Sequence, residues 1–417
     1  MPSLSIYEHK NTFTMINTRR VMTLAATLLL AAYGWAQMRI TFEGIEAKET
    51  VLADGSTYVQ LPSGTNLNDF AQMGMDVTVG GRSVPLADIT PNPATTFITA
   101  NEIETFIYDG KAYSFRFSNN EYSHYLFAYF NGNNQWQEQI CFALSDDGFN
   151  YTPLNGGAPV ISSADIALKQ AVRDPHILRG EDGYFYMVVT DMCSSQGWAS
   201  NDGLVLLRSG DLINWTHTAI DFPTLWPSRF DRNSLTQVWA PQTIYDPEEG
   251  KYMVYYTIGE SGKNHIIYYS YANEDFTELD EPQVLYDHNG QNTIDADIVW
   301  HNGEYHMFFK TEGQGNGIQK ATATTLKGPW TPEHKDLQQT KDDVEGSCVF
   351  QLIGSDTWVL MYDCYNSGRY EYCTSTDLRA FTYHSQSVNT SIFTPRHGTT
   401  ITITIEEKQR LLKAFGH

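Results

Sequence analysis

The stretch GYFYMVV, residues 183–189, is a glycine followed by a run of aromatic and aliphatic residues. Similar stretches recur at intervals of about 50 to 70 residues: HYLFAYF (124–130), GKYMVYY (250–256), GEYHMFF (303–309) and DTWVLMY (356–362). Turn sequences introduce three of these runs, as is typical of short strands joined by tight turns. A repeat of this length matches one propeller blade, so the five copies predict a five-bladed β-propeller.

A second repeat supports this prediction. SDDGFNYT (145–152), SGDLINWT (209–216) and STDLRAFT (375–382) share a serine, an aspartate, an aromatic residue and a threonine. We expect each aspartate to cap a turn between outer strands and each aromatic ring to pack between blades. A ligand contact is the alternative role for these residues.

The rest of the chain predicts an all-β protein with a small extra domain. Aromatic residues make up 13% of the sequence, which favours strands. Residues 37–116 alternate polar and apolar residues between Gly and Pro turns and predict a small β-sandwich-like domain. Residues 117–417 form the predicted propeller. They end in a short helix, with a capping box at Thr404 and Glu407 and a stop at Gly416.

The N-terminal segment has the features of a secretory signal peptide. Arg19 and Arg20 precede the apolar run VMTLAATLLLAA (21–32), and the small residues Gly34 and Ala36 follow it. We interpret residues 1–36 as a signal peptide, which predicts a secreted or periplasmic protein. The apolar run is too short to span a bilayer comfortably, so no membrane insertion is expected.

Charge and cysteine usage narrow the classes of partner. The formal net charge is −22, which disfavours nucleic acid and anionic lipid surfaces and is compatible with a neutral sugar; solubility alone is the alternative explanation. Five cysteines without CxxC spacing argue against a zinc site or a disulfide framework and indicate small buried residues. The sequence gives no indication of the oligomeric state.

Carboxylates are the remaining candidates for chemistry, because no GxSxG, HExxH or P-loop motif is present. They lie in the segments that precede the aromatic runs, where each innermost strand is expected: AVRDPHIL (171–178), NTIDADIVW (292–300) and DDVEGSCVF (342–350). Asp174, Asp295 and Glu345 should therefore face one pocket from equivalent positions. Each acid alone is more simply a turn or ion-pair residue, but together they suit glycoside hydrolysis, which uses paired carboxyl groups.

Five motifs in order resemble those of glycoside hydrolase family 43: VRDPHIL (172–178), WAP (239–241), TIDADIVWHNGEYHMF (293–308), VEGSCVF (344–350) and PRHGT (395–399). The resemblance covers roughly residues 120 to 412 and implies an inverting glycosidase on a five-bladed propeller. It implies that Asp174 is the general base, Glu345 the general acid, and Asp295 the residue that orients the acid and tunes its pKa. Asp297 competes with Asp295 for this role, because alternation along a strand turns both side chains to the same face.

The resemblance also implies further site residues. His397 matches a histidine that in many members holds a water or a metal ion at the propeller centre, so a structural calcium or other ion, held by His397 through water, is a candidate there; the chemistry itself requires no cofactor. Trp239 would help to wall the pocket, and Arg173 or Arg396 would contact sugar hydroxyls. The chain departs from the family pattern at Gln242, where an acid is frequent, and at Ser347, where many members have proline.

The expected function is therefore hydrolysis of arabinose-containing plant polysaccharide or oligosaccharide by a secreted α-L-arabinofuranosidase or arabinanase. A β-xylosidase or β-galactosidase of the same family is the nearest alternative. A fructan hydrolase is disfavoured because no NDPNG-like motif is present. A non-catalytic sugar-binding propeller is disfavoured because binding alone does not require three converging carboxylates.

Overall fold

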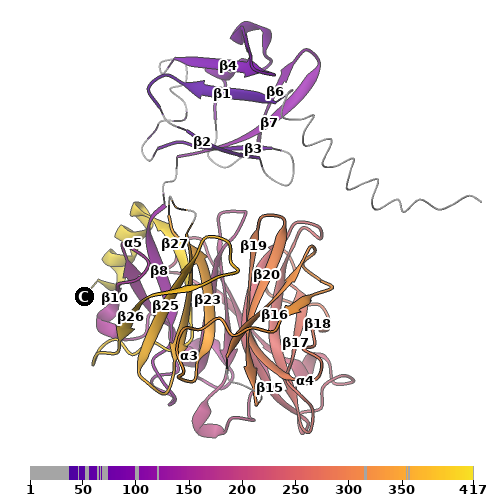
Figure 1. Cartoon of the computed structure of the whole chain (residues 1–417), viewed down its shortest axis with the longest axis vertical. Coiled ribbons are helices and arrows are strands. Elements are labelled where there is room, and N and C mark those ends of the chain that lie inside the picture. Colours follow the sequence, from indigo (N-terminus) through magenta and orange to yellow (C-terminus); the bar gives the residue numbers. More distant parts are fainter. Residues whose placement is uncertain are drawn as a thin grey trace, which may run out of the picture. The chain divides into compact units, whose positions relative to one another are not determined.

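The computed structural model describes residues 37–416 apart from 46, 52–55, 63–64, 66, 68–73, 99–102, 120–121, 314–316, 354 and 356. The predicted signal peptide lies outside the described residues and stays a prediction. The chain divides into two compact units, the second of which begins at Tyr122 (Figure 1). This is later than the predicted boundary at 116/117, which lies inside a strand of the first unit, Lys111–Ser118.

The first unit consists of two β-sheets around one core. One sheet has the order β1-β4-β5 and the other β2-β3-β7-β6. Their strands are β1 (Met38–Phe42), β2 (Lys48–Val51), β3 (Thr57–Gln60), β4 (Met75–Val79), β5 (Arg82–Val84), β6 (Ile103–Tyr108) and β7 (Lys111–Ser118). Ile40 of one sheet and Phe106, Phe115 and Phe117 of the other belong to the same buried cluster. This arrangement confirms the predicted sandwich-like fold.

The second unit contains five four-stranded antiparallel sheets. Each sheet is one blade, and four of them are continuous in sequence. They are formed by β11 (Val172–Arg179), β12 (Phe185–Asp191), β13 (Gly203–Ser209) and β14 (Thr216–Asp221); β15 (Leu235–Asp246), β16 (Lys251–Glu260), β17 (Ile266–Tyr271) and β18 (Gln283–Tyr286); β19 (Asn292–His301), β20 (Glu304–Glu312), β21 (Ile318–Ala323) and β22 (Thr331–Glu333); and β23 (Glu345–Gln351), β24 (Trp358–Cys364), β25 (Arg369–Ser375) and β26 (Thr382–Val388).

The remaining blade joins the two ends of the unit. Its order is β10-β9-β8-β27, from β8 (Tyr122–Tyr129), β9 (Cys141–Ser145), β10 (Tyr151–Pro153) and β27 (Thr399–Thr404). The five inner strands β27, β11, β15, β19 and β23 contact one another in this order, and β23 contacts β27 again. The ring is therefore closed, and the predicted five-bladed propeller is confirmed.

The helices of the described chain are short. They are α3 (Ser163–Ile166), α4 (Phe222–Leu225) and α5 (Ile405–Phe415). The predicted capping box of α5 is present: Thr404 accepts from the N–H of Glu407, and Glu407 accepts from the N–H of Thr404. Gly416 is the C-terminal cap, as predicted. Among the described residues, no helix has the length and apolarity needed to cross a membrane.

The serine–aspartate repeat forms the predicted turns. In the first copy Asp147 accepts hydrogen bonds from the backbone N–H groups of Phe149 and Asn150 and from the hydroxyl of Ser145. The other two copies repeat this pattern around Asp211 and Asp377. The repeat is thus structural, as expected.

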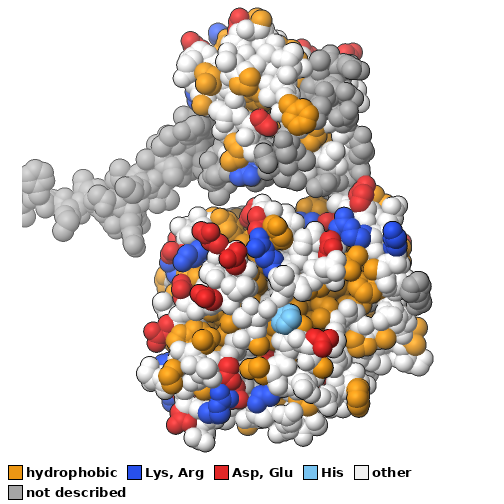
Figure 2. All heavy atoms as spheres, turned by 180° about the vertical axis from the view of Figure 1, so that it is seen from behind, with side chains coloured by type: hydrophobic (Ala, Val, Ile, Leu, Met, Phe, Trp, Pro, Cys, Tyr) orange, Lys and Arg blue, Asp and Glu red, His pale blue; other side chains and the backbone are white. Residues whose placement is uncertain are grey.

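The structure also shows how the charged side chains are distributed and where the cysteines lie. Acidic and basic side chains are interspersed over one face of the second unit (Figure 2). All five cysteines are free and buried, which confirms that they are small core residues.

Candidate active site

Four of the five inner strands contain a break in their pairing near the first residues. In β11 the register with β12 shifts between Arg173 and His176, and β15, β19 and β23 shift in the same way. One residue inside each break has a positive φ: Asp174 (51°), Ala240 (45°), Asp295 (56°) and Gly346 (61°). Such a bulge redirects side chains, and a non-glycine residue adopts this φ only at an energetic cost. The fold therefore holds Asp174 and Asp295 at equivalent, strained positions.

Glu345 occupies a different position in its strand. It directly precedes Gly346, which is the residue of β23 with the positive φ. The expectation that all three acids are equivalent is therefore wrong for Glu345, because glycine takes the strained position in its blade.

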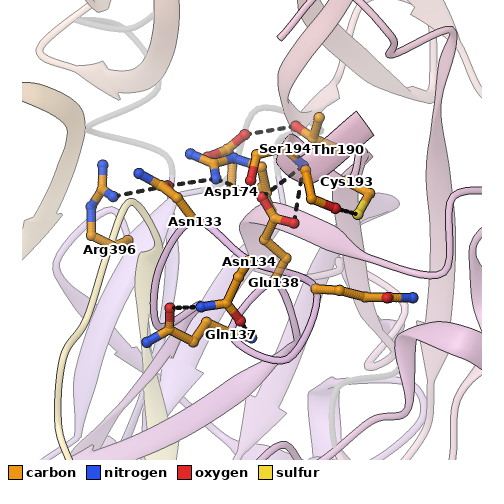
Figure 3. Close-up of polar contacts among 12 residues, drawn as sticks. Asn133, Asn134, Gln137, Glu138, Asp174, Thr190, Cys193, Ser194 and Arg396 are labelled. Atoms are coloured by element: carbon orange, nitrogen blue, oxygen red, sulfur yellow. Dashed lines mark hydrogen bonds and ion pairs between the residues drawn. The ribbon is translucent and has the colours of Figure 1, made fainter. Parts of the chain in front are cut away.

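Asp174 and Asp295 both lie beside His397. Nδ1 of His397 is 3.5 Å from Oδ1 of Asp174 and 3.8 Å from Oδ2 of Asp295. The hydroxyl of Thr190 donates to Oδ2 of Asp174 at 2.8 Å (Figure 3), and the N–H of Gly346 donates to Oδ2 of Asp295 at 3.1 Å. Because Glu345 adjoins Gly346, these contacts bring all three predicted acids to one end of the propeller centre.

Two cations hold the carboxylate of Glu345. Nη2 of Arg396 donates to Oε1 at 2.6 Å, and Nζ of Lys310 donates to Oε2 at 3.3 Å. Lys310 is buried, and the Glu345 side chain is 19% exposed. Glu345 is therefore a partly accessible acid in a double ion pair.

Arg396 is bonded to protein groups through all three guanidinium nitrogens. Besides Glu345, its Nε donates to Asp363 at 2.5 Å and its Nη1 to Asn133 at 3.2 Å (Figure 3). Asp363 is buried. The guanidinium thus bridges two carboxylates, and the predicted sugar contact of Arg396 stays a prediction.

Arg173 is enclosed in a second network. Its Nη1 donates to Asn133 at 2.8 Å and to the fully buried Glu138 at 3.0 Å. The guanidinium carbon lies 4.4 Å from the ring centre of Phe130 and 5.1 Å from that of Trp198. Arg173 is therefore fixed next to Asp174, and its sugar contact also stays a prediction.

Trp239 borders the same region. Its ring stacks on His265 at 5.6 Å and meets Trp198 edge to face at 6.4 Å. Its indole nitrogen is buried, without a hydrogen-bond partner among the described residues. This placement suits the predicted role of Trp239 in the pocket wall, which stays a prediction.

Sequence reasoning missed Thr190, Lys310 and Asp363, although a signal for them exists. Each directly follows one of the repeated aromatic runs, which end at residues 189, 309 and 362. In each of these blades, the second strand therefore places the residue that follows its aromatic run beside the acids. Asn133 and Glu138 were also missed, because they lie in the loop between β8 and β9, outside the repeated sequence runs.

Comparison with known proteins identifies the family of the chain. A family model described as a probable glycosyl hydrolase domain, and related to glycosyl hydrolase family 43, matches residues 120–409. The chain belongs to this family. It is a glycosidase, and the resemblance noted in its sequence is confirmed. No curated protein sequence matches the chain.

Several solved structures of family 43 proteins are similar to this glycosidase. An α-L-arabinofuranosidase from Lactobacillus brevis shares 17% identity, with 57% of this chain and 82% of that chain covered and a TM-score of 0.43. A GH43_1 enzyme from Xanthomonas citri complexed with xylose shares 17%, covering 55% and 75%, with a TM-score of 0.43. An exo-β-1,3-galactanase from Clostridium thermocellum shares 12%, covering 53% and 48%, with a TM-score of 0.40.

Electrostatics distinguish the acids of the glycosidase. Burial, opposed by His397 and aided by the nearby Glu345, raises the pKa of Asp295 to about 6. Burial also acts to raise the pKa of Glu345, but Lys310 and Arg396 outweigh it and hold that pKa below its ordinary value. Of these two acids, Asp295 is therefore the one whose pKa is raised.

Asp297 is separated from Asp295 by the bulge. Oδ2 of Asp297 accepts from the N–H of Val349 at 2.6 Å, and Oδ1 accepts from the amide of Gln242 at 2.8 Å when that amide is oriented to suit its neighbours. Burial raises the pKa of Asp297 to about 7. The register shift between Ile294 and Asp297 breaks strict alternation here, and both side chains accept from backbone N–H groups of β23, Asp295 from Gly346 and Asp297 from Val349. The geometry favours Asp295 as the partner of Glu345.

The ion predicted at His397 finds no ligand set in the described chain. No three His, Cys, Asp or Glu side chains there are grouped as metal ligands. Nδ1 of His397 faces the two aspartates, and its ring packs so closely that a Cβ on Gly346 would lie 2.5 Å from it. These residues do not fit a directly held metal, so no step below involves one.

Proposed function

We propose that this glycosidase is an inverting enzyme that cleaves arabinose-containing plant polysaccharide or oligosaccharide. Asp174 is the general base, Glu345 the general acid, and Asp295 the residue that orients and tunes the acid. The observation that supports the proposal most strongly is the arrangement around His397 and Gly346, which places two bulge aspartates beside a third, partly accessible carboxyl group.

Asp174 suits the role of base. Its Oδ2 accepts from the hydroxyl of Thr190, and its Oδ1 lies beside Nδ1 of His397. Both contacts orient the carboxyl group, which in the role of base accepts a proton from the attacking water. The water attacks the anomeric carbon from the side opposite the leaving oxygen, so the configuration inverts.

Glu345 suits the role of acid by its position, and its charge environment sets the working pH. It must hold a proton to pass to the glycosidic oxygen as the bond to the anomeric carbon breaks. Burial favours protonation of Glu345, whereas Lys310 and Arg396 oppose it. Because Lys310 and Arg396 prevail, kcat/KM should be greatest at acidic pH and fall as Glu345 loses its proton.

The two roles can be separated by leaving-group chemistry. We expect Asp174→Asn to abolish hydrolysis of both p-nitrophenyl α-L-arabinofuranoside and α-1,5-arabinotriose. Glu345→Gln should nearly abolish hydrolysis of the trisaccharide but retain more activity on the nitrophenyl substrate, whose leaving group needs little protonation. Steady-state kinetics of the wild type and both variants test this.

The same kinetic measurements, extended to p-nitrophenyl β-xyloside and β-galactoside, determine which sugar the enzyme releases. Cleavage confined to the xyloside or galactoside would replace arabinose by that sugar. If neither variant differed from the wild type on any of these substrates, the assigned roles would be wrong.

A further inference from the structure

A half-exposed tryptophan lies beside the site in the loop between β12 and β13. Trp198 is 51% exposed, although the enclosing loop, residues 192–202, also contains fully buried Asn201. Exposing so large an apolar ring to water is unfavourable, and such surfaces often mark binding sites. The sequence-based assignment of substrate contacts did not include Trp198.

The position of the ring relative to the acids is well defined. One contact is with the guanidinium of Arg173, 5.1 Å from the ring centre, and Arg173 directly precedes the proposed base Asp174. The other is with Trp239, whose ring centre is 6.4 Å away. Trp198 therefore extends the wall formed by Trp239, on the Asp174 side of the site.

Hydrogen bonds hold the loop around Trp198 in place. The N–H of Ser194 donates to both carboxylate oxygens of Glu138 at 3.1 Å, which ties the loop to the Arg173 network (Figure 3). Asn201 donates to the carbonyl oxygens of Asp191 and Gly203 at 2.9 and 2.8 Å. The exposed ring is thus presented by an anchored loop, and a ligand would not have to order it first.

The charge around the ring favours an uncharged ligand. Glu138 already balances Arg173, the cation in contact with Trp198. A sugar offers an apolar C–H face to the indole and keeps its hydroxyl groups on the edges, where water or protein can bind them.

We propose that Trp198 is the platform for a second sugar unit of the substrate, next to the unit held at Asp174 and Glu345. This inference rests on the proposed function of the same site. It assigns the enzyme a substrate of at least two linked neutral sugars, bound more tightly than a single glycoside.

Binding to a variant that cannot turn over tests the proposal. We would measure by calorimetry how methyl α-L-arabinofuranoside and α-1,5-arabinotriose bind to Asp174→Asn, with methyl β-xyloside and xylotriose in parallel. The trisaccharide should bind at least about tenfold more tightly than the monosaccharide glycoside, and adding Trp198→Ala should remove that advantage, a change of about 1.4 kcal/mol per factor of ten. Trp198→Phe should restore part of it.

Trp300 provides a matched control. It is 50% exposed but lies at the far end of β19, with its ring centre 4.5 Å from that of Tyr305 in a tilted contact. Trp300→Ala in the same background should leave both affinities unchanged. The proposed role of Trp198 would be wrong if the trisaccharide and the monosaccharide glycoside bound equally well. It would also be wrong if a folded Trp198→Ala variant kept the trisaccharide affinity. Failure of the wild type to hydrolyse any of these sugars would instead contradict the proposed function.

Discussion

At the scale of single residues, the account depends on how the propeller controls one carboxyl group. Glu345 is bonded to Lys310 and Arg396, and Arg396 is shared with Asp363 and Asn133. The identity of the acid could be predicted from the VEGS motif. Its two cationic partners were not predicted, because they come from other strands and approach Glu345 only in the closed ring.

Replacing Lys310 should change the pH profile in a definite direction. The Lys310 cation lowers the pKa of Glu345, so Lys310→Met should raise that pKa. Glu345 would then keep its proton to higher pH, and the basic limb of kcat/KM should move upward by about one pH unit. Lys320→Met is the control, because Lys320 is also buried but pairs with Glu333 and Leu378. An equal shift in both variants, or none in Lys310→Met, would contradict the assigned pairing.

Asp297 should make stability depend on pH. Burial raises its pKa in the folded protein to about 7, whereas an unfolded aspartate titrates near about 3.9. Because this pKa is higher in the folded protein, the contribution of Asp297 to the free energy of unfolding is fully present below the unfolded-state pKa. It is lost as the pH rises towards 7. Asp297→Asn cannot titrate, so the free energy of unfolding of the wild type relative to this variant should fall by on the order of 3 kcal/mol between about pH 4 and 7. Denaturant titrations at several pH values measure this difference; a constant difference would refute it.

At the scale of elements, the bulges at the starts of the inner strands create the site. The sequence indicated where these strands begin, but it did not reveal that the pairing of β19 shifts between Ile294 and Asp297. Nothing in the pattern IDAD reveals that Asp295 adopts a φ of 56°. The only bulge residue that signals its conformation by type is Gly346, because glycine tolerates a positive φ.

Gly346 should be intolerant of a side chain. It has a φ of 61°, and a Cβ there would meet the ring of His397 at 2.5 Å. Gly303 has a φ of 86° with open space around its Cβ position, so Gly303→Ala should cost only the backbone term, about 1 kcal/mol. Gly346→Ala should cost more than this and should lower kcat/KM at least about tenfold by displacing His397 from the two aspartates. Equal stability loss and unchanged kinetics in the two variants would show that His397 does not position the acids.

At the scale of the whole molecule, the closing strand joins the ends of the propeller. The five aromatic runs were enough to predict the number of blades. They did not show that β27, near the C-terminus, is the inner strand of the blade that contains β8. That pairing links residues far apart in sequence, such as Thr399 with Ala128, and no local pattern encodes it.

Two C-terminal truncations should distinguish the contribution of strand β27, which closes the ring of blades, from that of helix α5. A chain ending after residue 398 lacks β27, so the blade formed by β8, β9 and β10 loses its inner strand and the ring opens; we expect no cooperative thermal unfolding of the second unit. A chain ending after residue 404 keeps β27 and loses only α5, including the ion pair between Glu407 and Arg179. It should fold with a lower Tm. Cooperative unfolding of the second unit in the shorter chain would contradict the role of β27.

The stereochemistry of the first product tests the central claim most directly. Time-resolved proton NMR of α-1,5-arabinotriose hydrolysis identifies the anomer formed before mutarotation. With Asp174 activating water and Glu345 protonating the leaving oxygen, the first-formed sugar should be the β-anomer. Initial appearance of the α-anomer would mean retention through a covalent intermediate, and would contradict the roles assigned to both residues.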